Sequence, residues 1–92
     1  MRFEWDESKA ARNLARHGVS FEEAATVFGD PLSETFDDPD HSAAERRFII
    51  IGMSEKGRML FVAHTDDGDA VRIISAREPT RGEREFYEES RI

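Results

Sequence analysis

The chain has 92 residues and a net charge of −7, with 38% hydrophobic and 36% charged residues, which is typical of one soluble globular domain over residues 1–92. It contains no cysteine, which excludes disulfide bonds and thiolate metal sites. No apolar run is long enough to cross a membrane, and no secretion signal follows Met1, so we expect a cytoplasmic protein.

The charge is unevenly distributed along the sequence. Of the 20 acidic residues, six lie in residues 30–45 and three in residues 66–69, and neither segment contains a base. The remaining 11 acids stand against 13 bases, so the rest of the chain is mildly basic. Charges act over about 8–10 Å in physiological salt, so a local basic cleft is compatible with the negative total. That total nevertheless predicts weak non-specific binding to nucleic acid.

The start of the sequence predicts a short extended segment at residues 3–5, followed by a helix. Asp6 is a suitable N-cap, the helix ends near His17, and Gly18 is the expected residue after its C-terminus. Polar side chains recur at helical spacing along one side of this helix: Lys9, Asn13, Arg16 and His17.

A second helix is predicted to begin after Ser20. Ser20 and Glu23 have the spacing of a capping box. The apolar residues then follow the period of a helix that buries one face: Phe21, Ala24, Ala25 and Phe28. The sequence Gly29-Asp30-Pro31 ends this helix.

The second half of the sequence predicts strands and a final helix. Three segments are rich in β-branched and aromatic residues and are separated by turn sequences: residues 46–53, 59–65 and 70–77. Residues 32–36 form a weaker, fourth candidate strand at an edge. Pro79 ends the last strand, and Thr80 and Glu83 form a second capping box for a helix that runs to about Ser90. The predicted fold class is therefore α+β, with N-terminal helices, an antiparallel meander of three to four strands and a C-terminal helix.

Two arginines of the last strand are candidates for binding phosphate. Strict alternation places Arg72, Ile74 and Ala76 on one face of the strand and Arg77 on the other. The forked donors of arginine suit phosphate oxygens. The alternative for each arginine is an ion pair with one of the many acids.

Histidines and one helix face supply further candidates. His17 and His64 can exchange protons near neutral pH, and His64 lies near the end of a strand. Arg84 and Tyr87 share one side of the last helix. The alternatives are that His17 complements the C-terminus of its helix, that His64 is a satisfied surface residue, and that His41 simply titrates in its acidic loop.

Short segments along almost the whole chain form one ordered pattern. They are Phe3-Glu4-Trp5-Asp6, Lys9, Asn13, residues 16–24, Phe28-Gly29-Asp30-Pro31, Glu45-Arg46-Arg47-Phe48 with Ile51-Gly52, residues 72–77, Glu83-Arg84 and Tyr87-Glu88-Glu89. This pattern resembles the BrnT toxins of type II toxin–antitoxin pairs. The resemblance implies a RelE-like fold and a ribonuclease that stops translation. It also implies a BrnA-like antitoxin with a ribbon-helix-helix part, which binds promoter DNA as a complex with the toxin.

The sequence thus predicts an endoribonuclease toxin that needs no metal or other cofactor. The ribose 2′-hydroxyl of RNA is itself the nucleophile, so the protein must supply only proton carriers and cations. The candidate catalytic residues are His17, His64, Arg72, Arg77, Arg84 and Tyr87. Within this set the histidines carry protons, with Lys9 and Tyr87 as alternatives, and the arginines bind phosphate. The candidate RNA-binding residues are Lys9, Arg12, Arg16, Arg46 and Arg81.

Two other classes of function are compatible with a small domain of this size. The alternative is a non-catalytic protein-binding module that acts as a co-repressor with its partner. A stand-alone DNA-binding protein is disfavoured, because no helix-turn-helix presents a basic recognition helix and the net charge is negative.

The strand sequences also predict a binding surface for a protein partner. Residues 48–51 and 60–63 carry apolar side chains on both faces of the sheet, whereas the C-terminal helix is mostly polar. We therefore expect an exposed apolar patch on the sheet face beside that helix, with the acidic segment 30–45 at its rim, where a basic antitoxin would bind.

Overall fold

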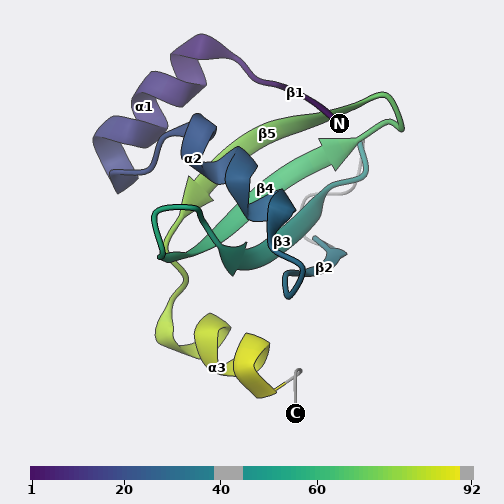
Figure 1. The fold of residues 1–92 in the computed structure, drawn as a ribbon. Helices are drawn as coiled ribbons and strands as arrows, with labels where there is room; N and C mark the ends of the chain where they lie inside the picture. The colour runs from purple at the N-terminus through teal and green to yellow at the C-terminus, as the bar shows by residue number, and fades with distance from the viewer. Residues whose placement is uncertain (39–44, 90–92) are drawn as a thin grey trace.

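The computed structural model describes residues 1–38 and 45–89 (Figure 1). In chain order the elements are β1 (Arg2–Glu4), α1 (Glu7–His17), α2 (Phe21–Thr26), the 3₁₀ helix η1 (Val27–Gly29), β2 (Glu34–Asp37), β3 (Phe48–Met53), β4 (Met59–Asp66), β5 (Ala70–Arg77) and α3 (Arg81–Glu89). His41 and part of the acidic segment 30–45 lie outside the described residues. Within the described residues, no helix has the length and apolar character needed to cross a bilayer.

The strands form a mixed five-stranded sheet in the order β1-β5-β4-β3-β2. β1 runs parallel to β5, with Phe3 opposite Val71, whereas the other neighbours are antiparallel (Figure 1). The predicted edge strand is confirmed as β2. The predicted meander of three to four strands was wrong in count, because β1 pairs with a strand far away in the sequence and no local pattern indicates that pairing.

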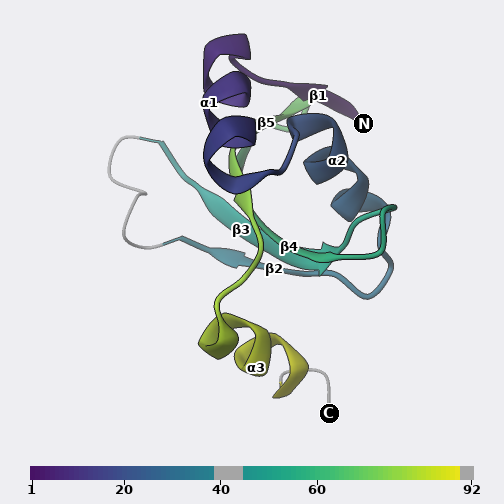
Figure 2. The ribbon, with the colours of Figure 1, turned by 90° about the vertical axis from the view of Figure 1, so that its left-hand side faces the viewer.

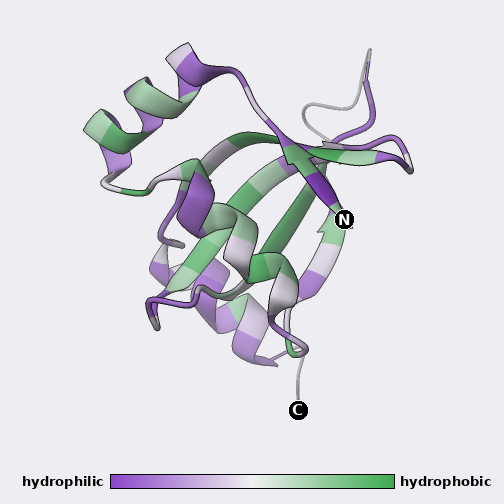
Figure 3. Cartoon of the chain, turned by 45° about the horizontal axis from the view of Figure 1, so that its top comes forward, coloured by the Kyte–Doolittle hydropathy of each residue, from purple (hydrophilic) through white to green (hydrophobic). Residues whose placement is uncertain are grey.

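The helices lie on both faces of the sheet, with α1 and α2 on one side and α3 on the other (Figure 2). The main core lies beneath α1 and α2. Its buried members are Val19, Phe21, Ala24, Val27, Ile50, Leu60, Val62, Ile73 and Ala76. The central strands are correspondingly the most hydrophobic part of the chain in Figure 3.

A second, smaller core occupies the opposite face of the sheet. Its buried members are Ile49, Ile51, Met59, Ala63 and Tyr87, the last from α3. The Tyr87 hydroxyl donates a hydrogen bond to the Leu32 carbonyl at 2.8 Å, which anchors the helix. The expectation of an exposed apolar patch on this face was therefore wrong. The mostly polar helix α3 covers this face with two aromatic side chains: Tyr87 is buried in the cluster, and Phe86 packs against Phe36 at 5.8 Å. Phe36, Phe61 and Ile74 pack around the same cluster.

The helix boundaries follow the capping residues. Asp6 accepts hydrogen bonds from the backbone of Ser8 and Lys9, and Gly18 takes a left-handed conformation (φ 69°) after α1, as predicted. Thr80 and Glu83 form the predicted capping box, each side chain accepting the backbone N–H of the other residue.

The first predicted capping box is realised only in part. Ser20 accepts the backbone N–H of Glu23 at 3.0 Å. The Glu23 carboxylate, however, binds Arg58 at 2.7 and 2.8 Å and the Ser54 hydroxyl at 2.8 Å. Hydrogen bonding to Arg58 lowers the pKa of Glu23 to about 2, despite the opposing effect of burial. This buried group ties α2 to the turn between β3 and β4.

A β-bulge interrupts the alternation of side chains along β5. Ala63 lies opposite Ser75 but His64 lies opposite Ile73, so Ile74 is an extra residue in the strand. As a result Ile73 shares the main core with Ala76, while Ile74 packs against the second core. The predicted common face for Arg72, Ile74 and Ala76 was therefore wrong.

Candidate functional site

A groove of about 530 Å³ lies between α1 and β5. It gathers four of the predicted site residues, together with neighbours from both elements: Lys9, Arg12, Arg16 and His17, with Asn13, Ala15, Ile74 and Ser75. The α1 residues recur at helical spacing and therefore lie on one side of the helix.

Asn13 holds α1 against β5. β1 ends opposite Arg72, so the edge of β5 beyond that point has no neighbouring strand. The Asn13 side chain takes that place: its Nδ2 donates to the Ala76 carbonyl at 2.7 Å, and its Oδ1 accepts the Ala76 N–H at 3.1 Å. Nδ2 also donates to the Val19 carbonyl at 2.9 Å. Because this buried amide is fully hydrogen-bonded, it fixes the width of the groove.

The groove is positively charged. Lys9, Arg12 and Arg16 are exposed, and no acidic residue lines the groove in the part of the chain that the structure describes. His17 is the last residue of α1, and its side chain is exposed to solvent. In a chain with a net charge of −7, this concentration of bases is a local exception.

Ser75 and Asn13 are groove residues that sequence reasoning missed as site residues. Ser75 lines the groove next to Ile74, the extra residue of the bulge, and bulges commonly occur beside functional sites. No local pattern in the sequence indicates the bulge. The helical spacing that joins Asn13 to Lys9 and His17 is the one available signal for that residue.

Arg77 lies outside the groove, in a network that holds α3. Its guanidinium forms a two-pronged ion pair with Glu83 at 2.7 and 2.9 Å and lies 4.2 Å above the Phe61 ring. The Arg77 guanidinium also donates a hydrogen bond to the Glu78 carbonyl at 3.2 Å. The ion pair lowers the pKa of Glu83.

The other predicted residues of α3 are not brought to the groove. Arg81 and Arg84 are exposed on α3, where Arg81 pairs with Glu85 at 3.1 Å. Tyr87 is buried in the second core.

Arg72 and Arg46 meet at a third place. They line a small pocket together with four acidic residues: Glu4, Glu45, Asp66 and Asp67. Arg46 also forms an ion pair with Asp37 at 3.0 Å and lies 5.1 Å above the Phe48 ring. The local charge here is mixed, unlike that of the α1–β5 groove.

His64 is enclosed in the protein interior. It is only 3% exposed and lies against the rings of Phe28 and Phe48, with centroid distances of 4.8 and 5.8 Å. Its Nδ1 is buried without a hydrogen-bond partner among the described residues, and burial lowers the pKa of the imidazole. The expectation of a satisfied surface histidine was wrong, because the hydrophobic residues of η1 and β3 enclose this end of β4.

Within residues 1–38 and 45–89, no group of three or more histidine or acidic side chains is arranged to hold a metal ion.

The structure is a small α+β domain in which three cationic side chains and one exposed histidine line a single groove. The chain belongs to the BrnT family: the sequence model of that family, described as the ribonuclease toxin BrnT of type II toxin–antitoxin systems, matches residues 5–83. Membership makes this a toxin-family ribonuclease, with RNA as its target and a protein antitoxin as its partner.

The structure agrees with that assignment. It is similar to the 1.1 Å crystal structure of the Brucella abortus ribonuclease toxin BrnT, with a TM-score of 0.67 and 25% sequence identity. The match covers 88% of this chain and 99% of the Brucella chain. Comparison with curated protein sequences gave no match.

Proposed function

We propose that this protein is an endoribonuclease toxin that cleaves single-stranded RNA in the α1–β5 groove without a metal ion. The observation that carries the proposal is the convergence of Lys9, Arg12, Arg16 and His17 on one groove that no described acid lines. Three cations bind the RNA backbone, and the histidine supplies a proton carrier beside them.

The proposed reaction uses the substrate's own nucleophile. The 2′-hydroxyl oxygen attacks the adjacent phosphorus while the bond from phosphorus to the 5′-oxygen breaks, which leaves a cyclic phosphate and a 5′-hydroxyl. His17 accepts the proton of the 2′-hydroxyl, and Lys9 is the candidate that protonates the departing 5′-oxygen. Arg12 and Arg16 stabilise the charge that develops on the phosphate oxygens in the transition state.

The proposed biological role follows from the reaction. Cleavage of RNA in the cell would stop translation, and the antitoxin would be a ribbon-helix-helix protein that also carries the complex to promoter DNA. Family membership supports a protein antitoxin, and the ribbon-helix-helix type remains part of this proposal.

The test uses purified free protein and total RNA in the presence of a chelator. We expect cleavage with chelator present, and we expect His17→Ala to reduce the rate by about 10²–10⁴-fold, the usual contribution of a proton carrier. The combined change Lys9→Ala and Arg16→Ala should also suppress cleavage. Lys56→Ala is the matched control, because this exposed lysine lies on the turn between β3 and β4.

Two results would contradict the proposal. Intact RNA at micromolar free protein would favour the non-catalytic partner-binding module. Equal loss of cleavage in Lys56→Ala and in the groove variants would mean that the α1–β5 groove has no special role.

A further inference from the structure

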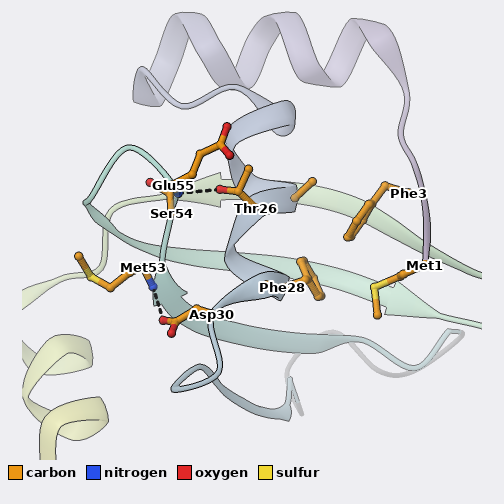
Figure 4. Close-up of a pocket in the computed structure, with 10 residues that line it drawn as sticks. Met1, Phe3, Thr26, Phe28, Asp30, Met53, Ser54 and Glu55 are labelled. Carbon is orange, nitrogen blue, oxygen red and sulfur yellow. Dashed lines mark hydrogen bonds between the residues drawn. The ribbon is translucent and has the colours of Figure 1, made fainter.

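A second groove, of about 640 Å³, lies beside η1 (Figure 4). It runs between β1, η1 and the turn that joins β3 to β4, and shares no lining residue with the α1–β5 groove. We call it the η1 groove. Its lining residues are Met1, Phe3, Ala25, Thr26, Phe28, Gly29, Asp30, Met53, Ser54 and Glu55.

The η1 groove is apolar at one end and acidic at the other. Met1, Phe3 and Phe28 form the apolar end, where the Phe3 and Phe28 rings pack at 5.2 Å (Figure 4). Asp30 and Glu55 lie towards the other end, and no basic residue lines the groove in the described part of the chain. Its charge is therefore opposite to that of the α1–β5 groove.

The acidic end of the groove is held in a fixed shape. The Asp30 carboxylate accepts the backbone N–H of Leu32 at 2.9 Å and that of Met53 at 2.8 Å. The Thr26 hydroxyl accepts the backbone N–H of Glu55 at 3.0 Å. A Cβ at Gly52 would lie 3.0 Å from an Asp30 oxygen, so the glycine permits this close approach. The groove is thus formed in advance, which lowers the entropic cost of binding.

Exposed apolar residues gather around this groove. Five large hydrophobic side chains are exposed among the described residues, and two of them line this groove: Met1 (86% exposed) and Met53 (41%). A third, Leu32 (55% exposed), lies two residues after Asp30 and donates its backbone N–H to the Asp30 carboxylate. Apolar side chains that gather around an acidic groove indicate a protein-binding surface rather than a nucleic-acid site.

We propose that the η1 groove is the anchor site for the protein antitoxin. Its occupant is a short antitoxin segment that inserts apolar side chains between Phe28 and Met53 and has lysine or arginine opposite Asp30 and Glu55. This inference rests on the proposed function, in which a protein antitoxin binds the toxin, and it assigns the surface to which that antitoxin binds. A segment bound here leaves Lys9, Arg12 and Arg16 uncovered, so the anchor and the RNA-cleaving groove are separate.

The test measures binding of the antitoxin, purified as the product of the neighbouring gene, to immobilised full-length toxin variants. Met53→Lys should weaken binding at least about tenfold, mainly through faster dissociation, because it removes an apolar contact from the groove. Glu55→Lys should mainly slow association and reduce its salt dependence, since a charge at the rim acts on the encounter. Both variants should cleave RNA at the wild-type rate.

Matched controls come from a third surface, between α1 and α2. Leu14→Lys and Glu22→Lys make the same kinds of change, a large apolar residue to lysine and glutamate to lysine, in a small pocket that both residues line. Each should change antitoxin affinity by less than about twofold, in line with a site outside the interface.

The outcomes separate this inference from the proposed function. Unchanged antitoxin binding in Met53→Lys and Glu55→Lys would overturn the anchor site, as would loss of binding confined to Lys9→Ala and Arg16→Ala. A change in the toxin's own oligomeric state would assign the groove to a second copy of the chain and would also overturn it. If no variant cleaves RNA, the proposed function fails while the binding comparison remains readable.

Discussion

Because His64 is buried, it makes the free energy of unfolding depend on pH. The imidazole is enclosed by Phe28 and Phe48, and burial lowers its pKa although the Asp66 charge acts in the opposite direction. In the unfolded chain a histidine titrates near pH 6.5. Below that pH the unfolded state binds more protons than the folded state, so the free energy of unfolding must fall as the pH falls.

We therefore predict that the free energy of unfolding decreases as the pH is lowered below about 7, and that His64 causes this decrease. The midpoint of urea unfolding should fall with pH in the wild type, and this dependence should flatten in His64→Phe, which keeps an aromatic ring among aromatic neighbours. His17→Gln is the control, because His17 is exposed and lies outside the enclosure formed by Phe28 and Phe48. An unaltered slope in His64→Phe would assign the acid sensitivity to other groups.

Single residues also mark the limit of prediction from the sequence. The helical spacing of Lys9, Arg16 and His17 predicts that they share a side, and the structure brings them to one groove. The role of Asn13 depends on where β5 lacks a neighbouring strand. That is a property of the sheet topology and has no signature in the sequence around Asn13.

At the level of elements, Arg77 and Glu83 connect β5 to α3. The two-pronged ion pair joins the end of the strand to the first turn of the helix, and Glu83 also caps that helix through the Thr80 N–H. Arg77 further covers the Phe61 ring. This arrangement gives Arg77 a structural role, since its donors are directed at Glu83 and the Glu78 carbonyl.

We predict that Arg77→Ala lowers the free energy of unfolding by about 1–3 kcal/mol, the usual range for charge-assisted hydrogen bonds with an aromatic contact. Glu83→Gln should destabilise in the same direction, and the double variant should cost less than the two single changes combined. Urea unfolding of the four proteins measures this coupling. Arg81→Ala, which breaks an exposed pair with Glu85, should cost less than about 0.5 kcal/mol.

Activity measurements separate this role from phosphate binding. If Arg77 acts on α3 alone, the RNA cleavage of Arg77→Ala should fall only with the folded fraction. A variant of undiminished stability that has lost cleavage would instead assign Arg77 to the substrate.

The ends of helices could be predicted from the sequence, because contacts between residues close in the sequence determine them. Asp6, Gly18 and the pair Thr80–Glu83 fix helix ends through contacts a few residues apart, and these predictions were confirmed. The parallel pairing of β1 with β5 and the bulge at Ile74 depend on contacts between distant segments. The sequence pattern contains no local signal for them, which is why the strand count and the faces of β5 were predicted wrongly.

The molecule as a whole keeps its two charge signs on different surfaces. The α1–β5 groove is lined by bases, whereas the acids Asp30 and Glu55 are the charged residues that line the η1 groove, and the two grooves share no lining residue. A chain with a net charge of −7 repels RNA except where the bases are concentrated. RNA binding should therefore depend on salt through a small, countable set of contacts.

We predict that the affinity for single-stranded RNA falls with salt with a log–log slope of about −2. Each phosphate contact contributes about −0.7 for single strands, and the groove offers three cations: Lys9, Arg12 and Arg16. The probe is an RNA with 2′-O-methyl groups, which cannot attack its own phosphates and so reports binding alone. Arg12→Ala should make the slope shallower by about 0.7.

The contrasting variant is Arg81→Ala on α3, across the sheet from α1 (Figure 2). Because Arg81 is exposed and pairs with Glu85, its removal should leave the slope near −2 if RNA follows the α1–β5 groove. A slope that changes with Arg81 but not with Arg12 would mean that RNA lies along α3. The salt slope therefore tests where the RNA backbone runs without depending on which residue transfers the proton.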